Sequence, residues 1–287
     1  MLNNFRTDLA IELHEINNKN LDGVTITEES ATNFKISKVS IENQNASKKF
    51  GKPMGIYYTV DLPSFNNLTY LQDEEIEFIS GKISEFLGEE KNLVFVVGLG
   101  NRDITPDSLG PRTISKIVST RHMKEDETFS EQFKCLRSVA TIAPGVLGQT
   151  GIEISEIVKS ITQKIKPSTI IVIDALVSNN INRLGSTIQI SNSGISPGSG
   201  VMNPRKEISQ NSLGVPIISV GIPTVVDAKT IIKDVTKCDI EDKIEPMIVT
   251  PKEIDNIIKH AADILSLIIN KALQTDLSLS EIRTLIP

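Results

Sequence analysis

The chain has 287 residues, of which 30 are Lys or Arg and 36 are Asp or Glu, so its formal net charge is −6. A hydrophobic share of 39% and a charged share of 23% are typical of a globular protein and exclude a disordered or collagen-like chain. The negative charge argues against broad nucleic-acid binding, which needs clustered basic residues, but it permits a basic protein as partner.

The sequence also predicts where the protein resides. No run approaches about 18 consecutive apolar residues, so we expect no membrane span. Residues 1–8 lack the basic and apolar pattern of a secretion signal. Cys135 and Cys238 stand in no metal-binding or redox motif, and we expect two reduced thiols. These features together predict a cytoplasmic protein without a metal or another cofactor.

The N-terminal part of the chain is rich in predicted strands. The first 20 residues show no clear element. Residues 24–42 alternate apolar and polar side chains, which favours antiparallel strands. A loop is expected over 43–55 and a further strand over 56–62. Residues 9–70 are therefore predicted to form a β-rich N-terminal addition.

Strands and helices alternate from residue 71 onward. We expect helices over 73–87, 108–119, 151–164 and 251–273, and strands over 93–97, 139–142, 169–173, 187–190 and 216–220. Thr250, Pro251 and Glu253 predict the start of the last helix, as N-cap, first residue and capping-box residue. This alternation predicts an α/β core over 71–287, with a mostly parallel sheet and helices on both faces.

Two aspartates follow apolar strands at the edge where ligands bind in open α/β sheets. Asp174 follows its strand directly, and Asp107 comes after a short loop. If the two strands are neighbours, the carboxyl groups share one proton, because two adjacent charges cannot both form cheaply. Such a pair can activate water for peptide hydrolysis. From spacing alone, however, a helix cap at Asp107 and bonds from Asp174 to loop amides are the better explanation.

Three other sites compete with the carboxylate pair. Gly98-Leu99-Gly100 has Asp103 where a dinucleotide-binding loop needs its third Gly, so we reject that reading. Ser196 lies in a G-x-S-x-G sequence, with Asp227 and His260 following in the order of an α/β-hydrolase. Pro197 and Gly198 argue against the helix which that motif requires. A carboxylate metal site of Asp107, Asp174 and Glu153 stays open.

Several segments, read together, resemble the germination proteases of spore-forming bacteria. The resemblance extends from Arg6 to about Leu273 and its motifs are jointly specific. They are Val97–Asn101 with Thr105–Pro111, Pro144–Val146 with Gly148–Glu153, Ile173–Leu176, Thr187–Ser191 with Gly194, Pro197–Val201, Gly221–Ala228 and Val249–Asp255.

The resemblance implies a fold like that of hydrogenase-maturation proteases and an atypical aspartic endopeptidase that degrades small acid-soluble spore proteins during germination, in the spore core. Its catalytic aspartates match Asp107 and Asp174. The family implies a homotetramer made as a zymogen that cleaves itself, at sites with Thr, an acidic residue, an apolar residue and Ala. Thr7-Asp8-Leu9-Ala10 imitates such a site. We therefore expect cleavage between Asp8 and Leu9, with residues 1–8 as propeptide and 9–287 as a single peptidase domain.

Two further points concern the substrate-binding loop and one difference from the family's usual sequence. Gly198, Ser199 and Gly200 are candidates for a substrate-binding loop with exposed amides. The family commonly has His where this chain has Ser196, which makes the G-x-S-x-G match accidental and leaves the effect on activity open. The alternatives to this function are a metal-assisted or hydrogenase-maturation-like peptidase on the same fold, and a relative that binds spore proteins without cutting them.

Overall fold

The computed structural model describes residues 7–17, 21–30, 34–63, 65, 71–88, 92–125, 136–198, 205–236 and 247–286. Ser199, Gly200, Cys135, Cys238 and the first six residues, on which some of the predictions fall, lie outside this part of the chain. Within the described ranges, no helix combines the length and the apolar character that crossing a membrane requires.

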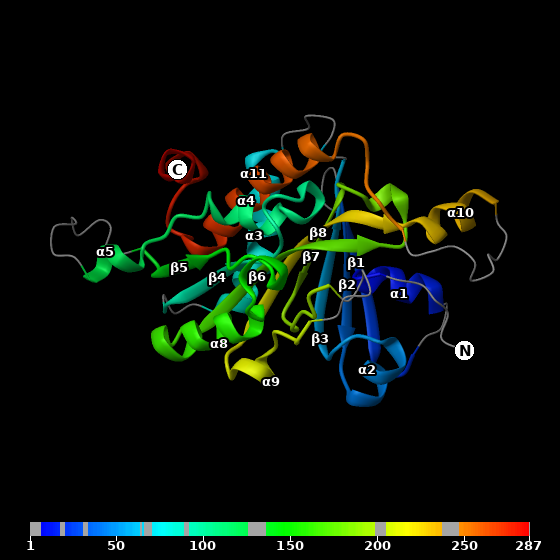
Figure 1. Cartoon of the computed structure of the whole chain (residues 1–287), viewed down its shortest axis with the longest axis horizontal. Coiled ribbons are helices and arrows are strands. Elements are labelled where there is room, and N and C mark those ends of the chain that lie inside the picture. The colour runs from blue at the N-terminus through cyan, green and yellow to red at the C-terminus, as the bar shows by residue number, and fades with distance from the viewer. Residues whose placement is uncertain are drawn as a thin grey trace.

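A single mixed sheet runs through the molecule (Figure 1). Its described strands are β1 (Val24–Ser30), β2 (Lys35–Ile41), β3 (Gly55–Asp61), β4 (Val94–Gly98), β5 (Val139–Ile142), β6 (Thr169–Ser178), β7 (Thr187–Ser191), β8 (Ile217–Asp227) and β9 (Ile248–Val249). Their order is β1-β2-β3-β7-β8-β6-β4-β5, with β9 paired to β8.

The sheet is parallel only in its α/β part. Strands β8, β6, β4 and β5 pair in parallel, whereas β1, β2, β3, β7 and β9 pair antiparallel with their neighbours. The α/β class and the β-rich N-terminal part are thus confirmed. The expectation of a mostly parallel sheet is correct for those four strands, while the N-terminal strands continue the same sheet through the β3–β7 pair.

Helices cover both faces of the sheet (Figure 1). The larger core packs one face against α3 (Asp73–Leu87), α4 (Leu109–Ile114), α11 (Ile254–Leu273) and α12 (Leu279–Leu285). On the other face, α8 (Ile154–Ile165) covers β4 and β6, while α1 (Ala10–Asn17) and α2 (Gln44–Phe50) cover β2 and β3. The remaining described helices are α5 (Arg121–Glu125), α7 (Leu147–Thr150), α9 (Gln210–Leu213), α10 (Ala228–Thr236) and the 3-10 turns η1 (Thr105–Asp107) and η2 (Ile181–Arg183).

Two helices near the N-terminus were not expected from the sequence. Helix α1 replaces the featureless stretch, because Ala10 and Ile11 are buried against the sheet. Helix α2 replaces most of the expected loop over 43–55. The side chain of Asn43 accepts a hydrogen bond from the backbone of Ala46 at its start, and Gly51 ends it in the left-handed conformation. In the sequence, the residues that cap its two ends, rather than a stripe of apolar residues, indicate this helix.

The bounds of three predicted helices also shift. The helix expected over 108–119 is α4, six residues long and preceded by η1. The one expected over 151–164 begins at Ile154. Helix α11 begins after Glu253, and Thr250 is not its N-cap, because the Thr250 hydroxyl donates to the carbonyl of Thr224 instead. Contact with the end of β8 takes precedence over the local capping motif.

The glycines of the rejected dinucleotide motif have a packing role. A Cβ atom at Gly98 would lie 2.4 Å from the carbonyl oxygen of Gly110, and one at Gly110 would lie 2.2 Å from that of Leu99. Strand β4 and the start of α4 therefore approach each other at backbone contact. This contact brings the turn that carries Asp107 to the carboxyl end of β4.

Candidate active site

A cavity of about 640 Å³ opens on the sheet face that carries α8, α1 and α2, between the two smaller cores. Asp174 on β6, Gly221 on β8 and Gln189 on β7 lie side by side in register and line it. A Cβ atom at Gly221 would lie 2.6 Å from the Leu176 side chain. The absence of a side chain at Gly221 therefore leaves room between Asp174 and Gln189.

Asp174 lies inside β6 and not in a loop after it, since β6 continues to Ser178 alongside β8. Its side chain is 8% exposed and accepts a hydrogen bond of 2.9 Å from the backbone N–H of Ala175. Burial raises the pKa of Asp174 well above the usual carboxyl range, and the negative charges of Asp107 and Asp8 raise it further. This carboxyl group is therefore disposed to hold a proton.

Asp107 ends η1 at the carboxyl end of β4, the strand next to β6. Its carboxylate accepts a 2.7 Å hydrogen bond from the backbone N–H of Asn101, and a Cβ atom at Gly100 would lie 1.9 Å from its carbonyl oxygen. Burial raises the pKa of Asp107, and the bond from Asn101 opposes that rise. Asp107 does not cap α4, whose N-cap is Ser108, and Asp174 bonds to an amide inside β6 rather than in a loop. Both aspartates line the cavity.

The N-terminal segment places Asp8 in the same cavity. The backbone N–H of Asp8 donates to the carbonyl of Val177 at 2.9 Å, and the Asp8 carboxylate accepts from the N–H of Val177 at 2.8 Å. The carbonyl oxygen of Asp8 accepts two bonds of 2.9 Å, from Nζ of Lys52 and from Nε2 of Gln189. The Oε1 atom of Gln189 accepts from the N–H of Ala10 at 2.8 Å. Gln189 thus holds both sides of the Asp8–Leu9 peptide.

The residue after this peptide is anchored by burial. Leu9 is 0% exposed and packs in a small core with Val39, Tyr57 and Leu176. The backbone N–H of Leu9 donates to Oγ1 of Thr7 at 2.9 Å. The segment is therefore held by an apolar side chain as well as by hydrogen bonds.

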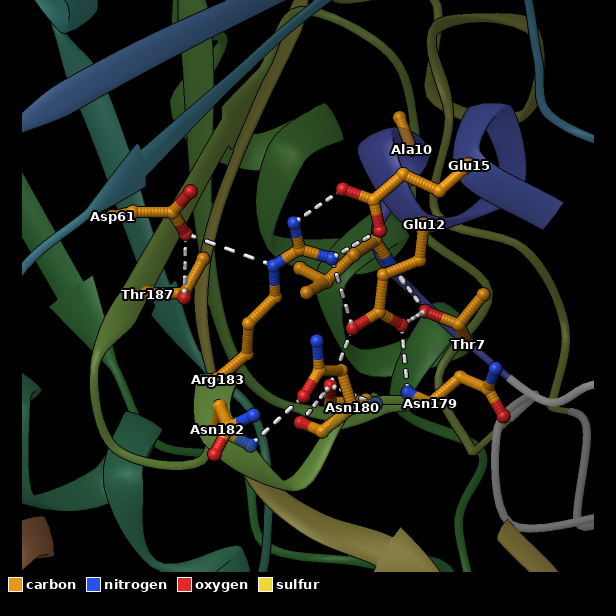
Figure 2. A network of polar contacts seen from close by, with 12 residues as sticks. Thr7, Ala10, Glu12, Glu15, Asp61, Asn179, Asn180, Asn182, Arg183 and Thr187 are labelled. Atoms are coloured by element: carbon orange, nitrogen blue, oxygen red, sulfur yellow. Dashed lines mark hydrogen bonds and ion pairs between the residues drawn. The ribbon is translucent and has the colours of Figure 1, made fainter. Parts of the chain in front are cut away.

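A buried carboxylate, Glu12, ties α1 to the end of β6 (Figure 2). It accepts hydrogen bonds from the hydroxyls of Thr7 and Ser178 and from the backbone N–H of Asn179. Arg183 lies 3.4 Å from Glu12 and forms a two-pronged ion pair with Glu15, at 2.7 and 2.9 Å. This network fixes the residues on both sides of Asp8.

Of the other residues predicted for a site, some line the cavity and others lie away from it. Gly198 lines the cavity with φ of +70°, and Ser196 lines it as well. Asp227 instead caps α10, through a bond from the N–H of Lys229. Nδ1 of His260 lies 2.9 Å from the carbonyl oxygen of Phe65. Neither Asp227 nor His260 lines the cavity, so the serine-hydrolase triad does not assemble.

Within the described ranges, no three His, Cys, Asp or Glu side chains are grouped closely enough to hold a metal ion. Glu153 lines the cavity, and one of its oxygens lies 3.9 Å from Arg205.

Lys52 and Gln189 line the cavity but were not among the site residues predicted from the sequence. Gln189 had a local signal, because it is a polar residue inside the apolar strand β7 and is only 7% exposed. Lys52 had none, since it follows α2 in what reads as a polar loop. Both residues reach Asp8 from far along the chain, over 44 and 181 positions.

The chain is similar to known proteins over nearly its full length. A family model described as Germination protease matches residues 5–241. The germination protease of Caldanaerobacter subterraneus subsp. tengcongensis is 41% identical, with 98% of each chain covered. Those of Clostridium perfringens and Clostridium acetobutylicum are 39% and 40% identical, covering 97% and 98% of this chain and 98% of each relative.

Among solved structures, the [NiFe] hydrogenase maturation protease HycI from Thermococcus kodakarensis aligns with a TM-score of 0.35 and 14% identity. The alignment covers 66% of this chain and 98% of that protein.

Proposed function

The chain belongs to the germination protease family, and we propose that it is an endopeptidase in which Asp107 and Asp174 activate the water that cleaves the peptide bond. The observation that carries this proposal is the shared cavity. The carboxyl group of Asp174 on β6 and that of Asp107, in the turn after the neighbouring parallel strand β4, line it, and the charge of Asp107 raises the pKa of Asp174.

The reaction needs one proton shared between the two aspartates. The ionised carboxylate takes a proton from water as the water oxygen attacks the peptide carbonyl carbon. The protonated carboxyl group gives its proton to the leaving nitrogen, and the C–N bond breaks. The products are a new carboxyl end and an amine. Because Asp174 is the more buried of the two, it carries the shared proton before the reaction begins. The pair titrates jointly, so both groups contribute to the pH profile.

We also propose that the chain processes itself between Asp8 and Leu9 and then cuts small acid-soluble spore proteins after acidic residues in the spore core. Support comes from Asp8, which lines the cavity, and from the apolar residue after it, Leu9, which is fully buried. Sequencing the N-terminus of the processed form tests this, and any start other than Leu9 contradicts it. The expected homotetramer is a separate proposal, tested by sedimentation.

Asp107→Asn and Asp174→Asn test the mechanism on a peptide containing Thr-Glu-Ile-Ala. General acid–base catalysis contributes about 10²–10⁴-fold, so each substitution should lower kcat by at least about 100-fold. Asp103→Asn is the matched control, because Asp103 is an exposed carboxylate in the Asp107 loop and does not line the cavity.

Three results would overturn this reading. Wild-type rates in either variant would exclude the carboxylate pair. Activity lost with a chelator and restored by a divalent ion would favour the metal-assisted alternative. Binding of spore proteins without any cleavage would favour the non-catalytic alternative.

A further inference from the structure

The carbonyl oxygen of Asp8 has an unusual environment for a backbone group near a chain end. It accepts one hydrogen bond from an ammonium group and one from an amide group, each 2.9 Å long. Both donors, Lys52 and Gln189, line the same cavity as Asp107 and Asp174. In self-processing, the Asp8 carbonyl is therefore the one that the water activated by the two aspartates would attack.

Attack of water on a peptide carbonyl moves negative charge onto its oxygen. Donors placed 2.7–3.1 Å from that oxygen stabilise the charge, and a fixed cation in a water-poor site does so most strongly. The Lys52 and Gln189 donors already have this distance before the reaction.

The hydrogen-bond partner of Lys52 agrees with this role. Burial lowers the pKa of Lys52, and the carboxylates of Asp8 and Glu12 oppose that lowering. A lysine that only neutralised a carboxylate would bond to the carboxylate oxygen. Here Nζ bonds to the Asp8 carbonyl, while the Asp8 carboxylate takes its bond from Val177.

We propose that Lys52 and Gln189 form an oxyanion site that polarises the carbonyl of the bond to be cut, first at Asp8 and then at the acidic residue of a substrate. This inference rests on the proposed peptidase function. Lys52 keeps its proton and Gln189 its amide hydrogens throughout. The proton of the protonated aspartate is then free to pass to the leaving nitrogen, which is that of Leu9 in self-processing.

The test uses Lys52→Met and Gln189→Met in the full chain, with self-cleavage followed by intact mass. Loss of one oxyanion donor costs about 10²–10³ in rate, so each variant should cleave at least roughly 100-fold more slowly. Lys52→Arg keeps the charge and the donor and should recover part of the rate. Lys49→Met and Gln210→Met, at exposed positions, are matched controls and should cleave like the wild type.

If Lys52 and Gln189 only anchored the N-terminal segment, their loss would release it. Hydrogen exchange at the N–H of Val177, which bonds to the Asp8 carboxylate, distinguishes this anchoring role from the oxyanion role. Slow cleavage with this amide still protected supports the oxyanion site, and slow cleavage with protection lost overturns it. Wild-type rates in both Met variants also overturn it. On the Thr-Glu-Ile-Ala peptide, kcat should fall while KM changes little, because the charge forms only in the transition state.

Asp107→Asn and Asp174→Asn are assayed in parallel, so the two proposals fail separately. If the Asn variants are inactive and the Met variants are not, only the oxyanion site is wrong. If the Asn variants cleave normally, the peptidase mechanism on which it rests is wrong. A wild-type chain that cleaves neither itself nor the peptide overturns both.

Discussion

Replacing Leu9 with Ala should release the N-terminal segment from its place beside the cavity. Leu9 is fully buried in a small core with Tyr57 and Leu176. Leu→Ala changes at such sites cost about 2.7–5 kcal/mol, and the lower end applies here because Leu9 lies outside a helix or strand, where the backbone can shift into the space. A cost of about 3 kcal/mol corresponds to a roughly 150-fold change in the equilibrium between the docked and released segment.

Hydrogen exchange on the intact chain measures this equilibrium directly. The N–H groups of Asp8 and Ala10 bond to Val177 and Gln189 only while the segment is docked. Their protection should fall roughly 150-fold in Leu9→Ala, because each is exposed whenever the segment is released. Amides inside β4 should keep their protection, since global unfolding is not required.

Leu13→Ala is the matched control on the same segment. Leu13 is only partly buried against the same core, so its loss should cost about 1 kcal/mol and change protection less than tenfold. Unchanged protection of Asp8 and Ala10 in Leu9→Ala would show that the Leu9 side chain does not hold the segment in place. Equal effects of the two substitutions would show that burial of Leu9 is not what holds the segment.

Two further predictions concern buried charge. Asp174→Asn should be more stable than the wild type at pH 7. The folded-state pKa of Asp174 is raised, so wild-type stability falls as pH rises from about 4, the unfolded value, through the folded value. Urea unfolding at pH 7 and below pH 4 measures this, and a less stable variant at pH 7 contradicts it. Arg183→Met should cost about 3 kcal/mol by thermal unfolding, because it removes the guanidinium group that lies 3.4 Å from the buried Glu12 carboxylate. Arg283→Met, which loses an exposed pair, should cost under about 1 kcal/mol, and equal losses would refute the distinction.

The elements with strong periodic patterns are evident from the amino-acid sequence alone. Continuous β-branched runs identified the buried strands β4 and β6, and helical spacing of apolar residues identified α3 and α11. These elements are recognisable because they depend on repeats of two or about four residues, which local sequence carries. The rule that ligands meet the carboxyl ends of parallel strands named Asp107 and Asp174 as candidates, but spacing alone did not favour them, and their catalytic roles stay a prediction.

Which strands pair, and which side chains meet at the cavity, follows only from the tertiary structure. The sequence did not show that β7 and β3 join the N-terminal strands to the parallel strands, or that β8 pairing extends β6 past Asp174. Helix α1 depends on burial of Ala10 and Ile11 against the sheet. The donors at the Asp8 carbonyl come from positions 44 and 181 residues away. Such contacts depend on which strands become neighbours, and no local pattern encodes that choice.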